Sequence, residues 1–304
     1  MIDRHPSERR RKPRLVKQIH RFADLWRAGG VEDYAISDVG ESQRRALRRM
    51  GSDFEITKHR IRLDVLPAAL NGFRIVQLTD IHLGVFLPEF LLRQAVQMVN
   101  ELEPDLVALT GDFVTYSRAY IEPVAEILAG IESKQGTFAV LGNHDFRVGA
   151  EEVAGALKNC GIGVLRNRHV KIRLHGESLY VAGIDDWFYS PDVGRALRGI
   201  PRNGSTVLLS HNPSVIRAAA SAHVPLVLSG HTHGGQVNLP LLGNIWGRSP
   251  EQLKYKVGWG RLGPTQIYVS RGIGTIVLPV RFRCPAEIPH FTLERTSSAT
   301  QSHV

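Results

Sequence analysis

Residues 137–145 read TFAVLGNHD, a short apolar run that leads directly into three polar side chains. The run from Thr137 to Leu141 contains β-branched and aromatic residues and ends at Gly142, a pattern typical of a buried strand. Asn143, His144 and Asp145 follow at once. Amide, imidazole and carboxylate groups directly after a buried strand indicate a ligand-binding or catalytic site.

The same arrangement occurs elsewhere in the chain, each time with a polar residue after a strand-like run. The runs cover residues 73–79, 106–111, 207–210 and 226–230, and they precede Asp80, Asp112, His211 and His231. Helical patterns lie between several of them, at 88–102, 119–131 and 150–160. Polar residues at the ends of adjacent strands meet in one crevice of an α/β sheet, so we expect an α/β fold in which these side chains converge.

Two of the polar residues belong to pairs with one residue between, Asp80 with His82 and His231 with His233. In an extended segment such a pair points to one side, because side chains alternate with period two. Each pair could bind one ion or reach two neighbouring ions. Asp112 stands alone and suits a carboxylate bridge between two cations about 3.5–4 Å apart.

The five blocks Asp-x-His, Gly-Asp, Gly-Asn-His-Asp, a lone His and Gly-His-x-His occur in this order and resemble the calcineurin-like metallophosphoesterase superfamily. The resemblance implies a four-layer α/β/β/α sandwich of two mixed sheets flanked by helices. It also implies Asp80, His82 and His233 on one metal and Asn143, His211 and His231 on the other, with Asp112 between them. His144 would donate a proton to the leaving oxygen, and Asp145 would hold His144.

Such a centre would hydrolyse a phosphodiester or a pyrophosphate. Oxygen and imidazole ligands without a thiolate suit manganese, iron or zinc, and we expect manganese first. A phosphomonoesterase, including a protein phosphatase, and a noncatalytic relative that binds membranes or protein partners are the alternatives. Comparing mono-aryl with bis-aryl phosphates, in several divalent metals, separates these hypotheses.

Gly230 to Gln236, with the glycine- and arginine-containing stretch 270–283, resembles the bacterial branch that includes membrane-associated phosphodiesterases and a UDP-2,3-diacylglucosamine pyrophosphatase. This resemblance implies a phosphorylated small-molecule or lipid-linked substrate. Arg271 and Arg281 are the expected phosphate ligands, because guanidinium groups bind phosphate oxygens in pairs. The adjacent carboxylates of Asp185 and Asp186 are interpreted as a polar turn, since neighbouring side chains of an extended segment point apart.

The chain divides by charge into an N-terminal basic arm, expected at 1–62, a catalytic domain at 63–296 and a tail at 297–304. Residues 1–60 contain 15 Lys and Arg against 9 Asp and Glu, which is typical of an interaction arm. Apolar residues between Leu15 and Trp26 recur at helical spacing among basic ones. Residues 14–28 therefore predict an amphipathic helix that either binds an anionic membrane surface or packs on the catalytic domain.

Composition limits the other classes of function. Two cysteines, Cys160 and Cys284, indicate no disulfide framework and a reducing compartment. No apolar run reaches the roughly 18 residues that cross a bilayer. We therefore expect a cytoplasmic protein, with peripheral attachment to the inner face of the cell membrane if the amphipathic helix binds lipid. Nucleic acid is not an expected partner, because aromatic residues make up only 7% and no stacking platform is visible.

Overall fold

The computed structural model describes residues 54–84, 87–238, 254–276 and 280–296. All the described residues belong to one compact unit. The predicted basic arm up to residue 53, its amphipathic helix and the C-terminal tail lie outside the described residues. Their predictions stay untested.

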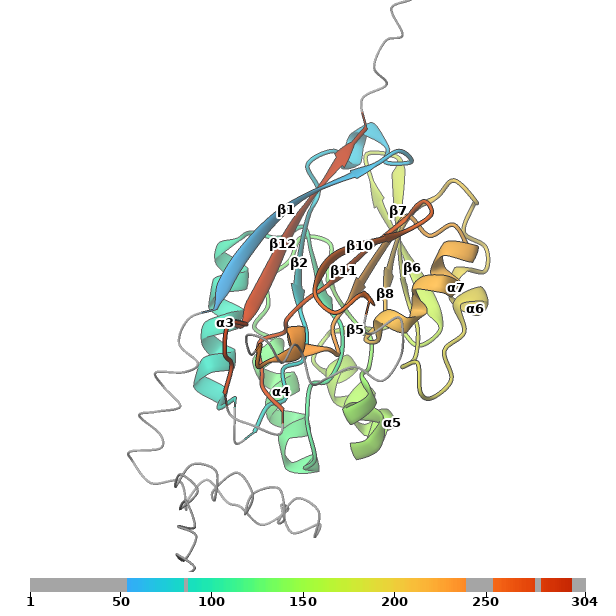
Figure 1. Ribbon diagram of the computed structural model, residues 1–304. Helices are drawn as coiled ribbons and strands as arrows, with labels where there is room; N and C mark the ends of the chain where they lie inside the picture. The colour runs from blue at the N-terminus through green and yellow to red at the C-terminus, as the bar shows by residue number, and fades with distance from the viewer. Residues whose placement is uncertain (1–53, 85–86, 239–253, 277–279, 297–304) are drawn as a thin grey trace, which may run out of the picture. The chain divides into compact units, whose positions relative to one another are not determined.

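Two six-stranded mixed sheets form the centre of the described unit (Figure 1). The first sheet has the order β1-β12-β2-β3-β4-β5 and the second has the order β10-β11-β9-β8-β7-β6. Strands β2 to β5 are parallel to one another, as are β7, β8, β9 and β11. The bounds of the first sheet are β1 Glu55–Leu63, β2 Arg74–Leu78, β3 Leu106–Leu109, β4 Thr137–Ala139, β5 Gly163–Val164 and β12 Glu287–Arg295. Those of the second are β6 Arg168–Leu174, β7 Glu177–Gly183, β8 Ser205–Leu209, β9 Leu226–Ser229, β10 Gly258–Leu262 and β11 Thr265–Val269.

Helices cover the outer face of each sheet. Helices α3 (Glu89–Glu101), α4 (Ile121–Leu128) and α5 (Asn143–Asn159) share one apolar cluster with the first sheet, and α6 (Val193–Leu197) and α7 (Ile216–Ser221) share another with the second. A third cluster joins residues of both sheets, among them Ile75, Leu106, Val207 and Leu228. The order helix, sheet, sheet, helix confirms the predicted four-layer sandwich.

Strand β1 begins before the predicted start of the catalytic domain. Strand β1 pairs with β12 in parallel along its whole length, from Glu55 opposite Glu287 to Leu63 opposite Arg295. The expected boundary at 62/63 therefore falls inside β1, and the sheet begins at Glu55. Exposed charged residues alternate along this edge strand, so its sequence resembles the basic arm rather than a buried strand.

Helix α5 begins seven residues earlier than the predicted helix at Ala150. Its first turn carries Asn143, His144 and Asp145, and a kink with φ 150° at Gly149 separates this turn from the rest. A left-handed or positive φ is readily adopted by glycine. Because the helix is kinked at Gly149, the pattern of apolar residues at helical spacing begins only after it. Helical periodicity therefore did not predict the first turn.

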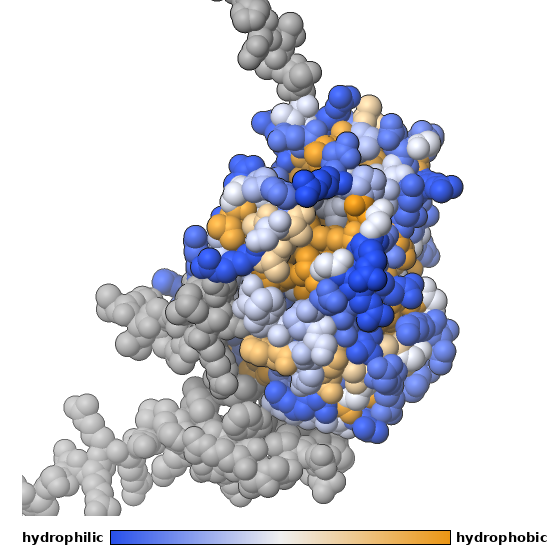
Figure 2. Space-filling model, turned by 90° about the vertical axis from the view of Figure 1, so that its right-hand side faces the viewer, coloured by the Kyte–Doolittle hydropathy of each residue, from blue (hydrophilic) through white to orange (hydrophobic). Residues whose placement is uncertain are grey.

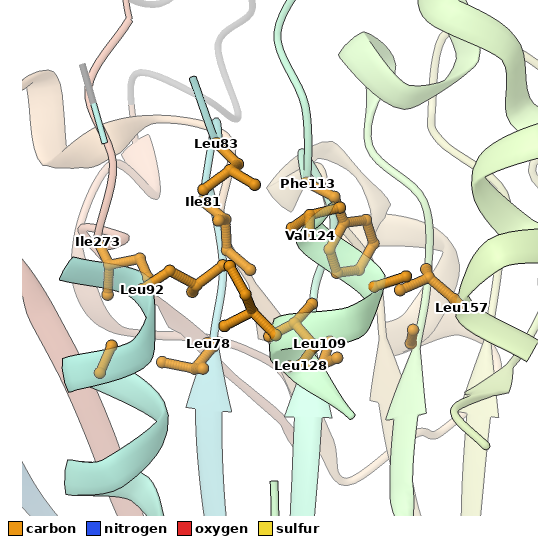
Figure 3. Packing of buried hydrophobic residues seen from close by; sticks show 14 of the residues in the cluster. Leu78, Ile81, Leu83, Leu92, Leu109, Phe113, Val124, Leu128, Leu157 and Ile273 are labelled. Atoms are coloured by element: carbon orange, nitrogen blue, oxygen red, sulfur yellow. The ribbon is translucent and has the colours of Figure 1, made fainter. Parts of the chain in front are cut away.

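The loops that follow β2 and β3 themselves carry large apolar side chains that pack into the core. Ile81, Leu83 and Phe113 alternate with polar residues and point into the cluster formed with α3, α4 and α5 (Figure 3). All three side chains are at most 1% exposed. Because a packed interior resists displacement, these residues fix the positions of the polar side chains between them.

The surface of the described part is largely polar on the side that carries α6 and α7, with apolar areas among the hydrophilic residues (Figure 2). None of the helices among the described residues has both the length and the apolar composition needed to span a bilayer.

Candidate metal centre

Six of the seven predicted ligands come together in two groups beside the carboxyl ends of strands from both sheets. Loops after β2 and β3 supply Asp80, His82 and Asp112, and the segments after β8 and β9 supply His211, His231 and His233. The seventh, Asn143, is the first residue of α5, which follows β4. All are buried except Asn143 and His231, which are half-buried. The predicted convergence of strand ends is confirmed.

The side chains form two groups, each close enough to bind one ion. In the first group, His82 Nε2 lies 3.1 Å from His233 Nε2, and His233 Nε2 lies 3.3 Å from Asp80 Oδ1. In the second group, His211 Nε2 lies 3.1 Å from Asp112 Oδ2 and 3.2 Å from His231 Nδ1. Each group draws ligands from both sheets.

One carboxylate oxygen joins the two groups. Asp112 Oδ2, besides its 3.1 Å contact with His211, lies 3.5 Å from His82 Nε2 of the other group. Asp112 Oδ1 accepts a hydrogen bond from the backbone N–H of His144 at 2.9 Å. This second bond directs Oδ2 toward both imidazoles, a geometry suited to a carboxylate shared by two cations.

The hydrogen bonds of His211 show why a cation fits here. The carbonyl oxygen of Thr110 lies 2.8 Å from His211 Nδ1, and a carbonyl can only accept, so Nδ1 carries the hydrogen. In the neutral ring the Nε2 lone pair then faces the Asp112 carboxylate. Burial opposes a charge on this ring, yet the carboxylates of Asp112, Asp80 and Asp186 raise the pKa of His211 well above its ordinary value. The carboxylates favour a positive charge at His211 Nε2, and a metal cation bound to Nε2 can take the place of a proton there.

The other donors also suit a metal. Burial lowers the pKa of His82 and of His231 to about 3, which keeps both imidazoles in the neutral form that binds metals. Burial raises the pKa of Asp80 to about 6, and a neighbouring cation would offset that effect. The Asn143 Oδ1 atom is buried and has no hydrogen-bond partner. The donor set therefore fits two divalent cations.

The backbone at these ligands is left-handed, contrary to the expected extended pairs. The φ angles are 52° at Asp80, 50° at His82, 57° at Asp112, 72° at His231 and 50° at His233. Such a conformation costs a non-glycine residue on the order of 1–3 kcal/mol and is concentrated at functional sites. The two donors of each pair still reach one group, but through turns of the backbone rather than by strand alternation.

Glycine allows the loops to approach closely enough. A Cβ atom on Gly142 would overlap the Asp112 carboxylate, and one on Gly230 would overlap Asp80 and Thr79. The backbone N–H of His231, next to Gly230, donates to both Asp80 carboxylate oxygens at 3.0 Å. A side chain at Gly142 would push the start of α5 away from the Asp112 loop, and one at Gly230 would push the His231 turn away from Asp80.

His144 is oriented by a backbone carbonyl and not by Asp145. Its Nδ1 lies 3.0 Å from the carbonyl oxygen of Thr115, so the hydrogen is on Nδ1 and Nε2 is free to exchange a proton. Asp145 instead accepts from the backbone N–H groups of Asp112, Phe113 and Gly142 at 2.8 Å. The role predicted for Asp145 is therefore wrong: this carboxylate ties the Asp112 loop to the start of α5.

The two predicted phosphate-binding arginines have internal partners. Arg281 is half-buried, and its guanidinium donates to carbonyl oxygens of Arg271, Gly272 and Gly274, with longer contacts to those of His233 and Cys284. Arg271 pairs with Glu55 and Glu287. Both guanidinium groups hold the C-terminal loops to β1, β12 and the His233 turn.

The structure adds three residues that the motifs do not reveal. Thr110 and Thr115 fix His211 and His144 through their carbonyls, and the Thr115 hydroxyl lies 3.0 Å from His82 Nδ1. The third is Asp186, which is fully buried with one carboxylate oxygen lacking a partner, whereas Asp185 pairs with Arg166. Backbone carbonyls leave no trace in residue types, so sequence patterns could not identify these contacts.

Comparison with known proteins places this geometry in a family. Residues 73–235 match the calcineurin-like phosphoesterases, a stretch that contains every ligand described above. The metallophosphoesterase YkuE of Bacillus subtilis is 34% identical over 80% of this chain and 86% of its own length. Phosphodiesterase YaeI of Escherichia coli is 31% identical over 77% of this chain and 86% of its own length.

A third relative is longer. A transmembrane protein with a metallophosphoesterase domain from Danio rerio is 33% identical over 77% of this chain, which spans 56% of that protein. The matched segments in all three cover most of the described unit. The chain therefore belongs to the calcineurin-like phosphoesterase family.

Proposed function

We propose that this chain is a dinuclear metal-dependent phosphodiesterase or pyrophosphatase. The observation that carries the proposal is the single carboxylate oxygen of Asp112 that contacts imidazoles of both ligand groups. A monophosphate, a diester and a pyrophosphate all suit such a centre. The name of the E. coli relative, a phosphodiesterase, favours the diester.

In this proposal Asp80, His82 and His233 hold one cation, Asn143, His211 and His231 hold the other, and Asp112 bridges them. When bound, the two metals lower the pKa of a water molecule and neutralise charge on the phosphoryl oxygens. Manganese is the expected metal, with iron or zinc as alternatives, since the donors are oxygen and imidazole. The Cys284 thiol donates to the His233 carbonyl and is not a member of either group.

His144 supplies the proton for the leaving oxygen. Its Nδ1–H is held by the Thr115 carbonyl, which leaves Nε2 as the atom that carries and releases the transferred proton. The ring lies edge-on to His82 and Tyr116, with centroids 5.1 and 5.7 Å away. These contacts hold Nε2 beside the metal ligands. General acids in this role contribute roughly 10²–10⁴ in rate.

The substrate is expected to be phosphorylated and either small or lipid-linked. A lipid-linked or nucleotide-lipid substrate would use the proposed amphipathic helix at 14–28 to bring the enzyme to the inner face of a membrane. Vesicle co-sedimentation of the full chain, compared with a version lacking residues 1–30, tests this attachment. Equal binding by both proteins would remove the membrane proposal and leave the chemistry unaffected.

Metal reconstitution tests the chemistry. The full-length protein is stripped with a chelator, reloaded with manganese, iron or zinc, and assayed with bis-p-nitrophenyl and mono-p-nitrophenyl phosphate. We expect manganese-dependent turnover of the diester above that of the monoester, with about two metals per chain by elemental analysis. Faster monoester hydrolysis would favour a phosphomonoesterase. No turnover in any metal, by folded protein, would favour a noncatalytic relative.

A panel of natural compounds then defines the substrate class. UDP-linked lipids, glycerophosphodiesters and cyclic nucleotides are assayed with the best metal, and Asp112→Asn serves as the inactive control. Hydrolysis by both proteins would indicate a contaminating enzyme.

A further inference from the structure

A rigid loop with three consecutive exposed aromatic residues borders the metal centre. Trp187, Phe188 and Tyr189 follow β7 and are 39%, 59% and 45% exposed. The loop between β7 and α6 lies beside α5 (Figure 1). Burying one such side chain stabilises a protein by about 1.5–3 kcal/mol, so exposing three in a row indicates a surface that binds something.

The loop contacts both sides of the centre. The Phe188 ring lies 6.0 Å from the ring of His231, a proposed metal ligand. The Tyr189 ring stacks on Phe146 at 4.3 Å and 16°, and Phe146 is two residues beyond His144 on α5. A group attached to a phosphate in the centre would therefore meet these rings.

Buried polar contacts keep the aromatic rings in place. The Asn167 side chain accepts from the backbone N–H of Asp185 and of Asp192, and donates to the Ser190 carbonyl. Arg166 holds Asp185 with two bonds of 2.8 and 3.1 Å. The loop is thus closed at both ends, and its rings are presented to solvent by a fixed backbone.

Asp186 fixes the backbone turn within the loop. Its Oδ1 accepts from the Phe188 N–H at 3.0 Å, and its carbonyl accepts from the Tyr189 N–H at 2.9 Å. Its Oδ2 is buried without a partner. Asp186 therefore sets the conformation of the turn that carries Phe188 and Tyr189.

We propose that Trp187 and Phe188, in the loop that Tyr189 anchors on Phe146, form an aromatic subsite that stacks on a planar ring carried by one ester group of the substrate. The nucleobase of a nucleotide diester is the biological form of such a ring. The inference rests on the proposed phosphodiesterase function and narrows it to ring-bearing diesters. Stacking of a base on an aromatic side chain is tolerant of the base and contributes about 1–3 kcal/mol.

Three diesters that share a glycerol leaving group test the subsite: the glyceryl ester of uridine 5′-monophosphate, bis-glyceryl phosphate and octyl glyceryl phosphate. We expect Phe188→Ala and Trp187→Ala each to raise KM for the uridine diester roughly tenfold, to change KM for bis-glyceryl phosphate by less than about twofold, and to leave kcat unchanged. Phe188→Tyr keeps an aromatic ring and should bind the uridine diester as the wild type does. Trp259→Ala is the matched control, because Trp259 is 42% exposed on β10 and lies outside this loop.

Equal effects of Phe188→Ala on the uridine and bis-glyceryl diesters, or no effect on either, would overturn the subsite. A shift for the octyl diester as large as that for the uridine diester would show a site for flexible chains and overturn the planar-ring assignment.

Binding measured without turnover separates this inference from the proposed function. Uridine 5′-monophosphate should quench tryptophan fluorescence in the metal-free wild type and in Trp259→Ala, and should not do so in Trp187→Ala. Quenching in a protein that hydrolyses no diester would refute the function and keep the subsite. Diester hydrolysis with identical kinetics in all variants would keep the function and refute the subsite.

Discussion

The two sheets contribute different chemistry to one centre. The loops of the first sheet and the start of α5 supply both carboxylates, Asp80 and Asp112, with His82, Asn143 and His144, the residue proposed as proton donor, whereas the loops of the second sheet supply three imidazoles. Neither set makes a complete group, because each group includes ligands from both sheets. Metal binding in this molecule should therefore stabilise the packing of one sheet on the other.

The sheets also differ in what surrounds their ligands. Ile81, Leu83 and Phe113 anchor the first set in a large apolar cluster. Beside the second set lies the exposed aromatic loop Trp187–Tyr189. We infer that the apolar cluster around the first set fixes the positions of its ligands, and that the aromatic loop beside the second set contacts the substrate.

Removing the shared carboxylate should have the largest effect. Asp112→Asn keeps the shape of the side chain but removes the charge that both groups contact, so we expect turnover to fall by roughly three orders of magnitude or more. Elemental analysis should show fewer metals per chain. A variant with full metal content and normal kcat would show that the two groups act independently.

Removing the proposed proton donor should affect rate and not metal content. His144→Ala should lower kcat by roughly 10²–10⁴ for an alkyl diester. The loss should be much smaller for a p-nitrophenyl ester, because that leaving group needs little protonation. Equal losses with the two esters would contradict proton donation by His144.

Changing a residue behind a ligand should have a moderate effect. Thr115→Val removes the hydroxyl that lies 3.0 Å from His82 Nδ1, and loss of such a partner lowers metal affinity about 10–100-fold. Thr115→Ser keeps the hydroxyl and is the control. Calorimetric titration with metal measures the affinity of each variant. Equal affinities of Thr115→Val and Thr115→Ser would show that the hydroxyl does not contribute to metal binding.

Metal removal tests the coupling of the sheets directly. At a metal concentration 100 times Kd, one site should stabilise the fold by about 2.7 kcal/mol. Thermal unfolding of the chelated protein should show this loss as a lower Tm. Hydrogen exchange should accelerate in the loops after β2 and β3 and also in those after β8 and β9. Acceleration in one sheet alone would argue against a centre shared by both.

Glu287 couples the sheets away from the metals and should have the smallest effect. From β12 it accepts from Tyr268 of β11 and from the N–H of Arg271. Burial opposes ionisation, but these donors and Thr57 lower the pKa of Glu287 below its ordinary value. A depressed carboxyl pKa stabilises the fold above the unfolded value, and this contribution is lost as pH falls through the folded value.

Glu287→Gln should therefore reduce stability by roughly 1–3 kcal/mol at neutral pH and flatten the fall in stability below about pH 4.5. Denaturant unfolding across pH checks both. An unchanged acid limb in the variant would assign the acid sensitivity to other carboxylates.

Much of the site was readable from local pattern. Strand-like runs followed by a polar residue predicted that Asp80, Asp112, Asn143, His211 and His231 converge, because a buried strand and the residue after it are adjacent in the chain. The same logic missed β1, whose charged edge positions obscure its pairing with β12. The roles of His144 and of each predicted ligand came from the family resemblance. The family resemblance also assigned Asp145 to His144, and residue type assigned Arg271 and Arg281 to phosphate, whereas the structure engages all three in internal bonds.

The sequence alone determined which donor types are present and in what order, since those follow from neighbouring residues. Tertiary structure decided the rest: which imidazoles Asp112 contacts, which nitrogen of each ring faces the centre, and which aromatic rings border it. These depend on contacts such as that between Thr110 and His211, which are 101 positions apart. Local pattern cannot encode such a contact, because only the packing of one sheet against the other brings the two residues together.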